Sequence, residues 1–537
     1  MLVRIFMALL LTATALPALA TPVTQHRTGW SDRLTWGGSA AQAYTPGIGS
    51  AQWLDQQLKT FDDALPPDAA AEVAAMEISQ KPMAALVADQ DAAIRYANHL
   101  ADPAQKEAAR RAYQQHMNNL AGQAATRSLL RDLYAQDQLR EQLSWFWFNH
   151  FNIHAQKRDI RAMIGDYENI IRARSLGRFR DLLEATLKHP AMLRYLDNDQ
   201  NRANHINENY AREIMELHSM GVGAGYTQKD VQELARILTG VGVNLNPSAP
   251  KLPLQRQALY IRAGLFEFNP NHHDFGDKDF LGHRIKGSGF GEVEQALDLI
   301  ATSPATARYI STQLATYFMG DQPPAGVIKK MTVTWRQRDG DIAAVLRTMI
   351  KTPEFRQSFG GAFKDPIHYA VSAVRLMYGD KVIVNAQPII GWLNRMGEGL
   401  YSHETPDGYP LSSSAWTGPG QMSVRFEIAR QIGAGAADLF KPSRALASLP
   451  RTGTTSLAMG GATQQAMAEP APVLANGSMR TAAPFLAALP LPKLESAAYY
   501  GEIAPALGAQ TKTVLTKATS PQEWNSLFLS SPEFMRR

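Results

Sequence analysis

The chain has 537 residues, of which 45% are hydrophobic and 19% are charged, so it is long enough to bury a large core and fold as a globular protein. Its formal net charge of +5 comes from 54 basic and 49 acidic residues without basic clusters, and we therefore expect no nucleic-acid partner. Cysteine is absent, which excludes disulfides, thiol nucleophiles, thiolate zinc sites and iron–sulfur clusters.

Residues 1–20 have the pattern of a signal peptide. Arg4 precedes an apolar run over residues 5–16, and Ala18-Leu19-Ala20 supplies the small residues that signal peptidase accepts. We expect cleavage near Ala20 and a periplasmic or secreted mature protein; an apolar N-terminal helix that stays in the protein is the alternative. No later segment is apolar over the roughly 20 residues that cross a bilayer, so no stable membrane span is expected in the mature chain.

Apolar residues recur at helical spacing through most of the chain. The clearest examples are residues 101–121, 139–154, 180–187, 231–238, 292–300 and 305–318. Convincing strands are scarce, and residues 254–268 alternate best, as one short hairpin would. The predicted fold is mainly α: a large multi-helix globular fold with at most a minor β-hairpin.

The chain divides into three predicted parts after the signal peptide. Residues 21–440 form a helical domain, with a division into two lobes, about 21–245 and 246–440, as an alternative. Residues 441–492 are rich in Ala, Pro and Ser and poor in charge, which is typical of a flexible insertion. Residues 493–537 are expected to return to the domain as a C-terminal helical segment.

Four apolar helices end in a polar residue followed by proline. The dipeptides are His189-Pro190, Ser303-Pro304, Thr352-Pro353 and Ser531-Pro532. The polar residue can cap the next helix, and proline fits its first turn because no partner is needed there for a backbone N–H. These positions are predicted to be helix–turn–helix corners.

Residues 207–221, NENYAREIMELHSMG, concentrate charge on one predicted helix. At about 100° per residue, Glu208, Arg212 and Glu216 form a row with Glu213 beside it. His218 falls in the apolar arc, about 200° from Glu216, so the two cannot chelate one ion on a regular helix. The row is either part of a functional site or a solvated salt-bridge ladder with the helix ending at a glycine.

Residues 139–154 contain LSWFWFNHFNIH, which is predicted to be a helix buried on nearly all sides. His150 and His154 have the i, i+4 spacing of zinc ligands, but Phe151 occupies the position where zinc peptidases of this pattern carry glutamate. A buried imidazole more often bonds to a carboxylate or carbonyl, so whether a metal is bound stays open.

Residues 268–282, FNPNHHDFGDKDFLG, form a predicted loop dense in Asn, His, Asp and Gly. His273 and Asp274 could act as ligands or as a general base on a rigid scaffold. The same composition is also typical of ordinary turns.

Together these segments are similar to a bacterial family known only as the domain of unknown function 1800. The resemblance rests on RLTWG, WLDQQL, WFWFNHF, PAMLRYLDN, NENYAREIMELHSMGVGAGYTQKDVQELARILTG, HDFGDKDFLG, SPATARYI and the terminal SSPEF. By matching position, the polar residues of its pattern are Asn149, His150, Asn207, Glu208, Asn209, Arg212, Glu213, Glu216, Asp230, Arg236, His273, Asp274 and Lys278. The resemblance implies an exported protein and, as a partner, an exported protein of the family numbered 1501.

The leading hypothesis is one polar pocket of catalytic residues formed by three segments. Its residues are His150, Glu208, Arg212, Glu213, Glu216, His273 and Asp274. Histidine beside carboxylates suits hydrolytic or lyase-type acid–base chemistry, and a divalent ion could share the site. The sequence identifies no cofactor. The alternative is a non-catalytic periplasmic assembly or binding protein that acts with an exported partner.

Overall fold

The computed structural model describes residues 28–39, 47–59, 64–246, 248–379, 381–441 and 493–537. The predicted signal peptide, residues 1–20, lies outside these residues, as does the predicted insertion apart from its first residue. The described chain is mainly α-helical, which confirms the predicted fold class. None of its helices is long and apolar enough to cross a membrane.

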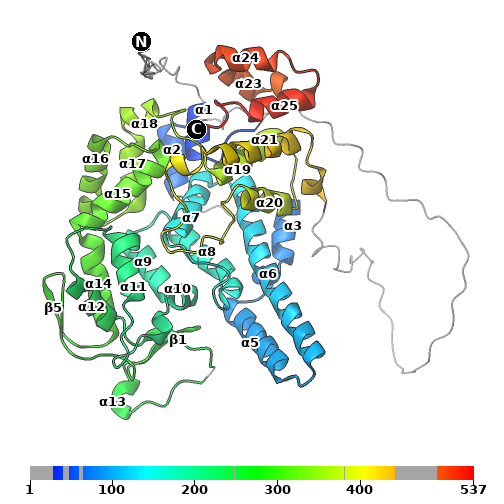
Figure 1. Cartoon of the computed structure of the whole chain (residues 1–537). Coiled ribbons are helices and arrows are strands. Elements are labelled where there is room, and N and C mark those ends of the chain that lie inside the picture. Colours follow the sequence, from blue (N-terminus) through cyan, green and yellow to red (C-terminus); the bar gives the residue numbers. More distant parts are fainter. Residues whose placement is uncertain (1–27, 40–46, 60–63, 247, 380, 442–492) are drawn as a thin grey trace, which may run out of the picture.

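The N-terminal part leads to a central buried helix, α7 (Figure 1). The helices are α1 (Thr28–Leu34), α2 (Ala51–Lys59), α3 (Pro67–Ala75), α4 (Glu77–Gln80), α5 (Met83–His99), α6 (Pro103–Tyr134) and α7 (Gln138–His150). The long helices α5 and α6 pack along each other. Every side chain of α7 is buried, as the apolar arc of its sequence predicts.

The middle part contains short helices and the sheets. The helical elements are η1 (Ile160–Ala162), α8 (Ile164–Arg174), α9 (Phe179–Lys188), α10 (Pro190–Tyr195), η2 (Asn198–Gln200), α11 (Asn209–Glu213), the π-helix η3 (Ile214–Ser219), α12 (Gln228–Ile237) and α13 (Leu254–Gln257). The strands are β1 (Val241–Val243), β2 (Ile261–Ala263), β3 (Phe266–Phe268), β4 (Lys278–Phe280) and β5 (His283–Ile285).

The remaining helices follow in chain order. They are α14 (Phe290–Thr302), α15 (Pro304–Met319), α16 (Ala325–Gln337), α17 (Ile342–Ile350), α18 (Pro353–Gln357), α19 (Pro366–Tyr378), α20 (Gln387–Arg395), η4 (Ser413–Ala415), α21 (Pro419–Gly433), η5 (Ala437–Phe440), η6 (Leu494–Ser496), α23 (Ala498–Ile503), η7 (Ala504–Ala506), α24 (Ala509–Leu515) and α25 (Pro521–Leu529). The C-terminal helix α25 packs against α21.

The strands form two small antiparallel sheets. β3 lies between β1 and β2, with Glu267 opposite both Gly242 and Arg262, and β4 pairs with β5. The predicted hairpin within 254–268 is therefore present as β2 and β3, but residues 254–257 are helical. The strands β1, β4 and β5 were not predicted, because three-residue strands are too short to show clear alternation.

Three of the four predicted corners are capped helix starts. The side chains of His189, Ser303 and Thr352 accept hydrogen bonds from the backbone amides of Ala191, Ala305 and Phe355. The hydroxyl of Ser531 also accepts from a backbone amide, but a turn follows it in place of a helix. Polar residue plus proline therefore does mark the direction changes of the chain.

Two helices differ from their predicted bounds. α7 ends at His150, so the predicted helix over 139–154 is too long, and His150 and His154 do not lie on one helix. The predicted regular helix over 207–220 is α-helical only to Glu213 and continues as a π-helix. The buried apolar cluster of the described residues runs from Leu34 to Met535 and includes residues of both predicted lobes; the division into lobes stays a prediction.

The cap at the α17–α18 corner gives a stability test. Thr352 accepts from the Phe355 amide at 3.2 Å and donates to the Met349 carbonyl at 2.7 Å. We expect Thr352→Ala to lower the free energy of unfolding by about 1 kcal/mol, measured by urea denaturation. Thr352→Ser keeps the hydroxyl and should lose less; an equal loss in both variants would show that the methyl group, and not the cap, is what matters.

Candidate functional site

The charged segment 207–221 contains a π-helix. The amides of Met220 and Gly221 both donate to the Met215 carbonyl at 3.1 Å, which widens the last turn. Gly221 has φ +89°, and a Cβ there would lie 2.7 Å from the Tyr309 ring, so only glycine fits this helix end. π-Helical turns occur frequently at functional sites, which draws attention to the residues on both sides of this one.

The predicted row of charges forms an ion-pair ladder. Arg212 donates to Glu208 at 3.1 Å and to Glu216 at 3.4 Å. It also donates to Oε1 of Gln228 on α12 at 2.9 Å, and Nε2 of Gln228 donates to Glu208 at 2.7 Å. About a third of each charged side chain is exposed, so the ladder holds α11 to α12 without a large contribution to stability.

Glu213 differs from its neighbours because its carboxyl group has no hydrogen bond or ion pair with any described residue. It is half-buried on α11. Burial raises the pKa of Glu213, and the charges of Glu216 and Asp407 raise it further, while Arg212 opposes them. The result is a carboxyl group that holds its proton to higher pH than an ordinary glutamate.

Asp407 belongs to residues 401–409, here called the 401–409 loop. Asn152 donates from its amide to the carbonyls of His403 and Thr405 at 3.0 and 2.8 Å, and the Tyr195 hydroxyl donates to the Glu404 carbonyl at 2.6 Å. These contacts hold the loop beside the end of α7 and α10. The charges of Asp407 and Glu213 both act on Tyr195, whose pKa burial raises first.

The end of α7 fits closely against this loop. Asn149 donates to the Tyr409 carbonyl at 2.9 Å and accepts from the Tyr409 amide at 2.7 Å. Gly408 has φ +71°, and a Cβ there would lie 2.1 Å from the Asn149 carbonyl oxygen. The approach of the loop to the helix therefore requires glycine at this position.

Sequence reasoning missed the residues that this loop contributes. His403 Nε2 lies 3.2 Å from Asp407 Oδ1 and 3.0 Å from the Thr405 hydroxyl, which also donates to Asp407. The available signal was Pro406-Asp407-Gly408, a typical turn sequence, which gives no indication of what the turn contacts.

Left-handed backbone conformations gather around the same loop. In the described part of the chain, five residues other than glycine have positive φ, and three of them are Arg158, Asp197 and Tyr401. The Tyr401 carbonyl accepts from Ala155 in the segment that leads to Arg158, and Lys157 pairs with Asp197 at 2.8 Å. Such conformations cost free energy and tend to cluster at functional sites.

His150 lies beside the π-helix as a neutral base. Its Nε2–H donates to the His218 carbonyl at 3.0 Å, so Nδ1 carries no proton. Burial lowers the pKa of His150 to about 4, and burial together with His150 lowers that of His218 to about 3. Both imidazoles are uncharged at neutral pH, and His218 points inward, away from the acids, as predicted.

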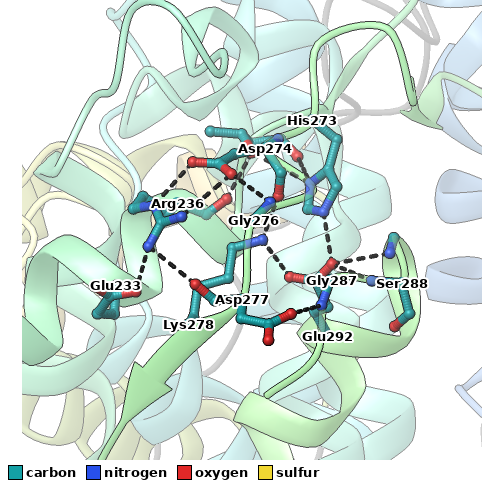
Figure 2. Close-up of polar contacts among 12 residues, drawn as sticks. Glu233, Arg236, His273, Asp274, Gly276, Asp277, Lys278, Gly287, Ser288 and Glu292 are labelled. Carbon is teal, nitrogen blue, oxygen red and sulfur yellow. Dashed lines mark hydrogen bonds and ion pairs between the residues drawn. The ribbon is translucent and has the colours of Figure 1, made fainter. Parts of the chain in front are cut away.

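His273 belongs to a different, fully buried network (Figure 2). Its Nδ1–H donates to the Thr239 carbonyl at 2.7 Å, and its Nε2 lies 2.9 Å from Glu292, which also pairs with Lys278. Burial alone would raise the pKa of Glu292, but the hydrogen bonds from His273, Lys278 and two backbone amides hold it below its ordinary value. The side chains of His273, Lys278 and Glu292 are 0% exposed, which identifies the network as a structural anchor for α14.

Asp274 joins this network to α12 (Figure 2). Arg236 donates to its two carboxylate oxygens at 2.8 and 3.3 Å, and also pairs with Glu233 at 2.7 Å. The Asp274 amide donates to the Thr239 hydroxyl at 2.9 Å. Within the described chain, no hydrogen bond, ion pair or ring contact joins His273 or Asp274 to His150, Glu213 or the ladder, so the single pocket stays a prediction.

The described residues contain no group of three histidine or carboxylate side chains arranged to hold a metal ion.

Comparison with known proteins identifies one family. The model of the family described as "Protein of unknown function (DUF1800)" matches residues 29–536. No curated protein matches the chain, and no solved structure does.

The buried network around Glu292 gives a second stability test. We expect Glu292→Gln to lower the free energy of unfolding by about 3 kcal/mol at pH 7, because the charge of Lys278 would stay buried without its partner. The native carboxylate has a lowered pKa, so its contribution is present above the pKa of the unfolded chain and is lost as the pH falls through the folded value. Urea denaturation at several pH values measures both effects.

The control for this variant is Asp89→Asn, which removes a largely exposed ion pair with Lys81. Its effect should stay within about 0.5 kcal/mol. If the two variants lose equal stability, the assignment of the Glu292 network as an anchor is wrong.

Proposed function

Because the chain belongs to the DUF1800 family, whose function is unknown, we propose its function from the site alone: Glu213 acts as the general acid–base residue of a hydrolase- or lyase-type site. Residues 1–20 support export, so the proposed substrate is extracytoplasmic. The Arg212 ladder and the 401–409 loop border the proposed site.

The proposal rests on one observation. Glu213 makes no hydrogen bond or ion pair with any described residue, whereas the polar residues named below each make at least one. Asn207 and Asn209 donate to the carbonyls of Asp197 and Leu196, and Asp230 caps α12 and accepts from the Leu281 amide. Glu208 and Glu216 both pair with Arg212, and Arg236 pairs with Asp274. His273 and Lys278 belong to the buried network around Glu292. A half-buried carboxyl group that makes no structural contact lowers the stability of the fold. A role in function explains why such a group is present.

The environment of Glu213 suits proton transfer. A glutamate whose pKa is raised by burial and by nearby carboxylates can donate a proton nearer neutral pH than an exposed one. Asp407, anchored by Thr405 and His403, supplies a second carboxylate on the facing loop, and the Arg212 guanidinium can stabilise negative charge that develops on a substrate. Two carboxylates and a cation meet the needs of an addition–elimination or hydrolytic step.

A binding or assembly function is the second candidate, and the ladder favours it. Arg212 and Glu208 both contact Gln228, so these charges join α11 to α12 in the way that a purely structural role requires. An exported protein of the family numbered 1501 would then be the proposed partner. The two candidates differ in what they predict for Glu213.

The raised pKa of Glu213 makes a stability prediction with a definite sign. A carboxyl group whose folded pKa exceeds its unfolded pKa contributes stability below the unfolded value, and this contribution is lost as the pH rises through the folded value. Glu213→Gln should therefore raise the melting temperature by about 1 to 2 °C at pH 7.5 and leave it unchanged at pH 4. Differential scanning calorimetry at both pH values measures the change.

Glu294→Gln is the matched control, since Glu294 is an exposed glutamate on α14. The Glu294→Gln variant should have the melting temperature of the wild-type protein at both pH values. The assembly candidate instead predicts that Glu213→Gln and Arg212→Met both destabilise the protein, because in that case the charged helix face as a whole, and not an ion pair of Glu213, holds the parts of the protein together. A lowered melting temperature for Glu213→Gln would count against the catalytic proposal.

Activity gives the direct test. Purified protein should be assayed on chromogenic carboxylic esters, phosphate esters and glycosides, and we expect Glu213→Gln to lower kcat on any responsive substrate by about 100-fold or more. Glu294→Gln should retain full activity. A turnover that Glu213→Gln leaves intact would place the chemistry elsewhere in the protein.

A further inference from the structure

A cavity lies beside α6, away from the residues discussed above. It has a volume of about 1100 Å³ and is bounded by α6, by α3 with the residue that follows it, by the start of α20 and by η5. None of its lining residues belongs to the Glu213 site or to the buried network around Glu292. Its size exceeds what one small metabolite fills and suits a longer ligand.

Carboxamides dominate the polar lining. Six Asn and Gln side chains face the cavity: Gln115, Asn118, Asn119, Gln123, Asn385 and Gln387. A carboxamide offers two N–H donors and one carbonyl acceptor, which is the same pair of groups that a peptide bond presents. A row of them can therefore pair with a polypeptide main chain.

Part of this hydrogen-bonding capacity is free. Gln123 uses its oxygen to accept from the Ile78 amide at 3.2 Å, and Asn118 uses its oxygen to accept from Arg161 at 2.5 Å. Both carboxamide NH₂ groups are left for a ligand. Gln115 and Asn119 make no hydrogen bond with any described residue. Gln123 and Asn118 are thus held in place by hydrogen bonds, whereas Gln115 and Asn119 have all their hydrogen-bonding groups available to a ligand.

The spacing of the row fits an extended chain. Gln115, Asn119, Gly122 and Thr126 follow one face of α6 at three- and four-residue intervals. Eleven residues of helix span about 16 Å, which is the length of about five residues of extended chain. Because Gly122 has no side chain, the middle of this helix face is recessed. The nearest atom to a Cβ built there is Gln387 Nε2 at 3.9 Å, so there is space above it.

The remaining lining excludes other ligands. Ala75, Met76, Ala112 and Pro388 supply small apolar surfaces. The described lining contains no Trp, Tyr or Phe, and its one imidazole, that of His116, is held by Glu77 at 2.7 Å and by Gln90 at 2.9 Å. Asp438 and Lys441 pair with each other at 2.6 Å, and Glu72 is buried. Sugars are usually held by stacking on aromatic rings, and charged ligands need unpaired opposite charges; an uncharged polypeptide with small side chains needs neither.

We propose that this cavity binds an extended, uncharged polypeptide segment through its main-chain amides. The carboxamides of α6 and α20 pair with the N–H and C=O groups of the peptide, and the small apolar residues receive its side chains. The site is independent of the proposed acid–base function, because no lining residue contacts Glu213.

The test uses the full-length protein and a fluorescein-labelled peptide of about ten residues that alternates Ser or Thr with Ala or Val, followed by fluorescence anisotropy. We expect saturable binding that Gly122→Leu weakens about tenfold or more, because leucine fills the low part of the α6 face. This variant should fold, since leucine is a better helix former than glycine and its Cβ meets no clash. A circular dichroism melt checks that it does.

Gly326→Leu is the matched control. Gly326 lies on α16 and is helical like Gly122, but it is exposed and does not line the cavity; a Cβ built there meets no atom within 4 Å. It should leave the peptide affinity unchanged within about twofold. Equal weakening by both variants would overturn the assignment of the site.

A peptide of the same sequence with alternate main-chain nitrogens methylated separates main-chain from side-chain recognition. We expect it to bind about tenfold more weakly or worse, because the methyl groups remove the donors that the carboxamides need. Equal binding of the methylated peptide, no binding of the parent peptide, or Gly122-dependent binding of maltohexaose or chitohexaose in its place would each overturn the proposal.

Discussion

The burial of α7 on every side is the constraint on which the other contacts depend. A buried polar group without a partner costs free energy, so each polar side chain of this helix has to find one inside the protein. Glu141 pairs with Arg172 on α8, Gln142 donates to the Thr35 carbonyl, and Trp147 donates to the Ser175 carbonyl. The last turn, with Asn149 and His150, fixes the 401–409 loop and the π-helix. One buried helix thereby determines where distant segments of the chain meet.

Much of this fold could be predicted because it follows from local chemistry. The apolar arc of α7 and the polar residue plus proline at the corners are properties of short stretches of sequence, and both appear in the structure. The π-helix could not be predicted in this way, because a helical wheel assumes a constant rotation per residue. Its widened turn ends at Gly221, where the Tyr309 ring leaves no room for a Cβ, and no local pattern contains the approach of that ring.

In the candidate site, too, contacts within one helix could be predicted from the sequence, whereas contacts between segments far apart in the chain could not. The ladder of Glu208, Arg212 and Glu216 was evident from spacing alone. Asp407 and His403 were not, because they lie almost two hundred residues away and belong to an ordinary turn sequence. In the sequence, His273 and Glu213 looked equivalent as polar residues of a motif. In the structure, His273 is buried and hydrogen-bonded, whereas Glu213 has no hydrogen-bonding partner among the described residues. Sequence records which groups are present, whereas function depends on which of them stay unsatisfied.

Gly408 contributes no reactive group and no side chain at all. It is nevertheless the position at which the 401–409 loop touches the Asn149 carbonyl of α7, at a distance that excludes even one methyl group. The loop can approach the helix this closely only because Gly408 has no side chain. In an evolving lineage such a position would be constrained as strictly as any acid or base in the site, although an inventory of functional groups would pass over it.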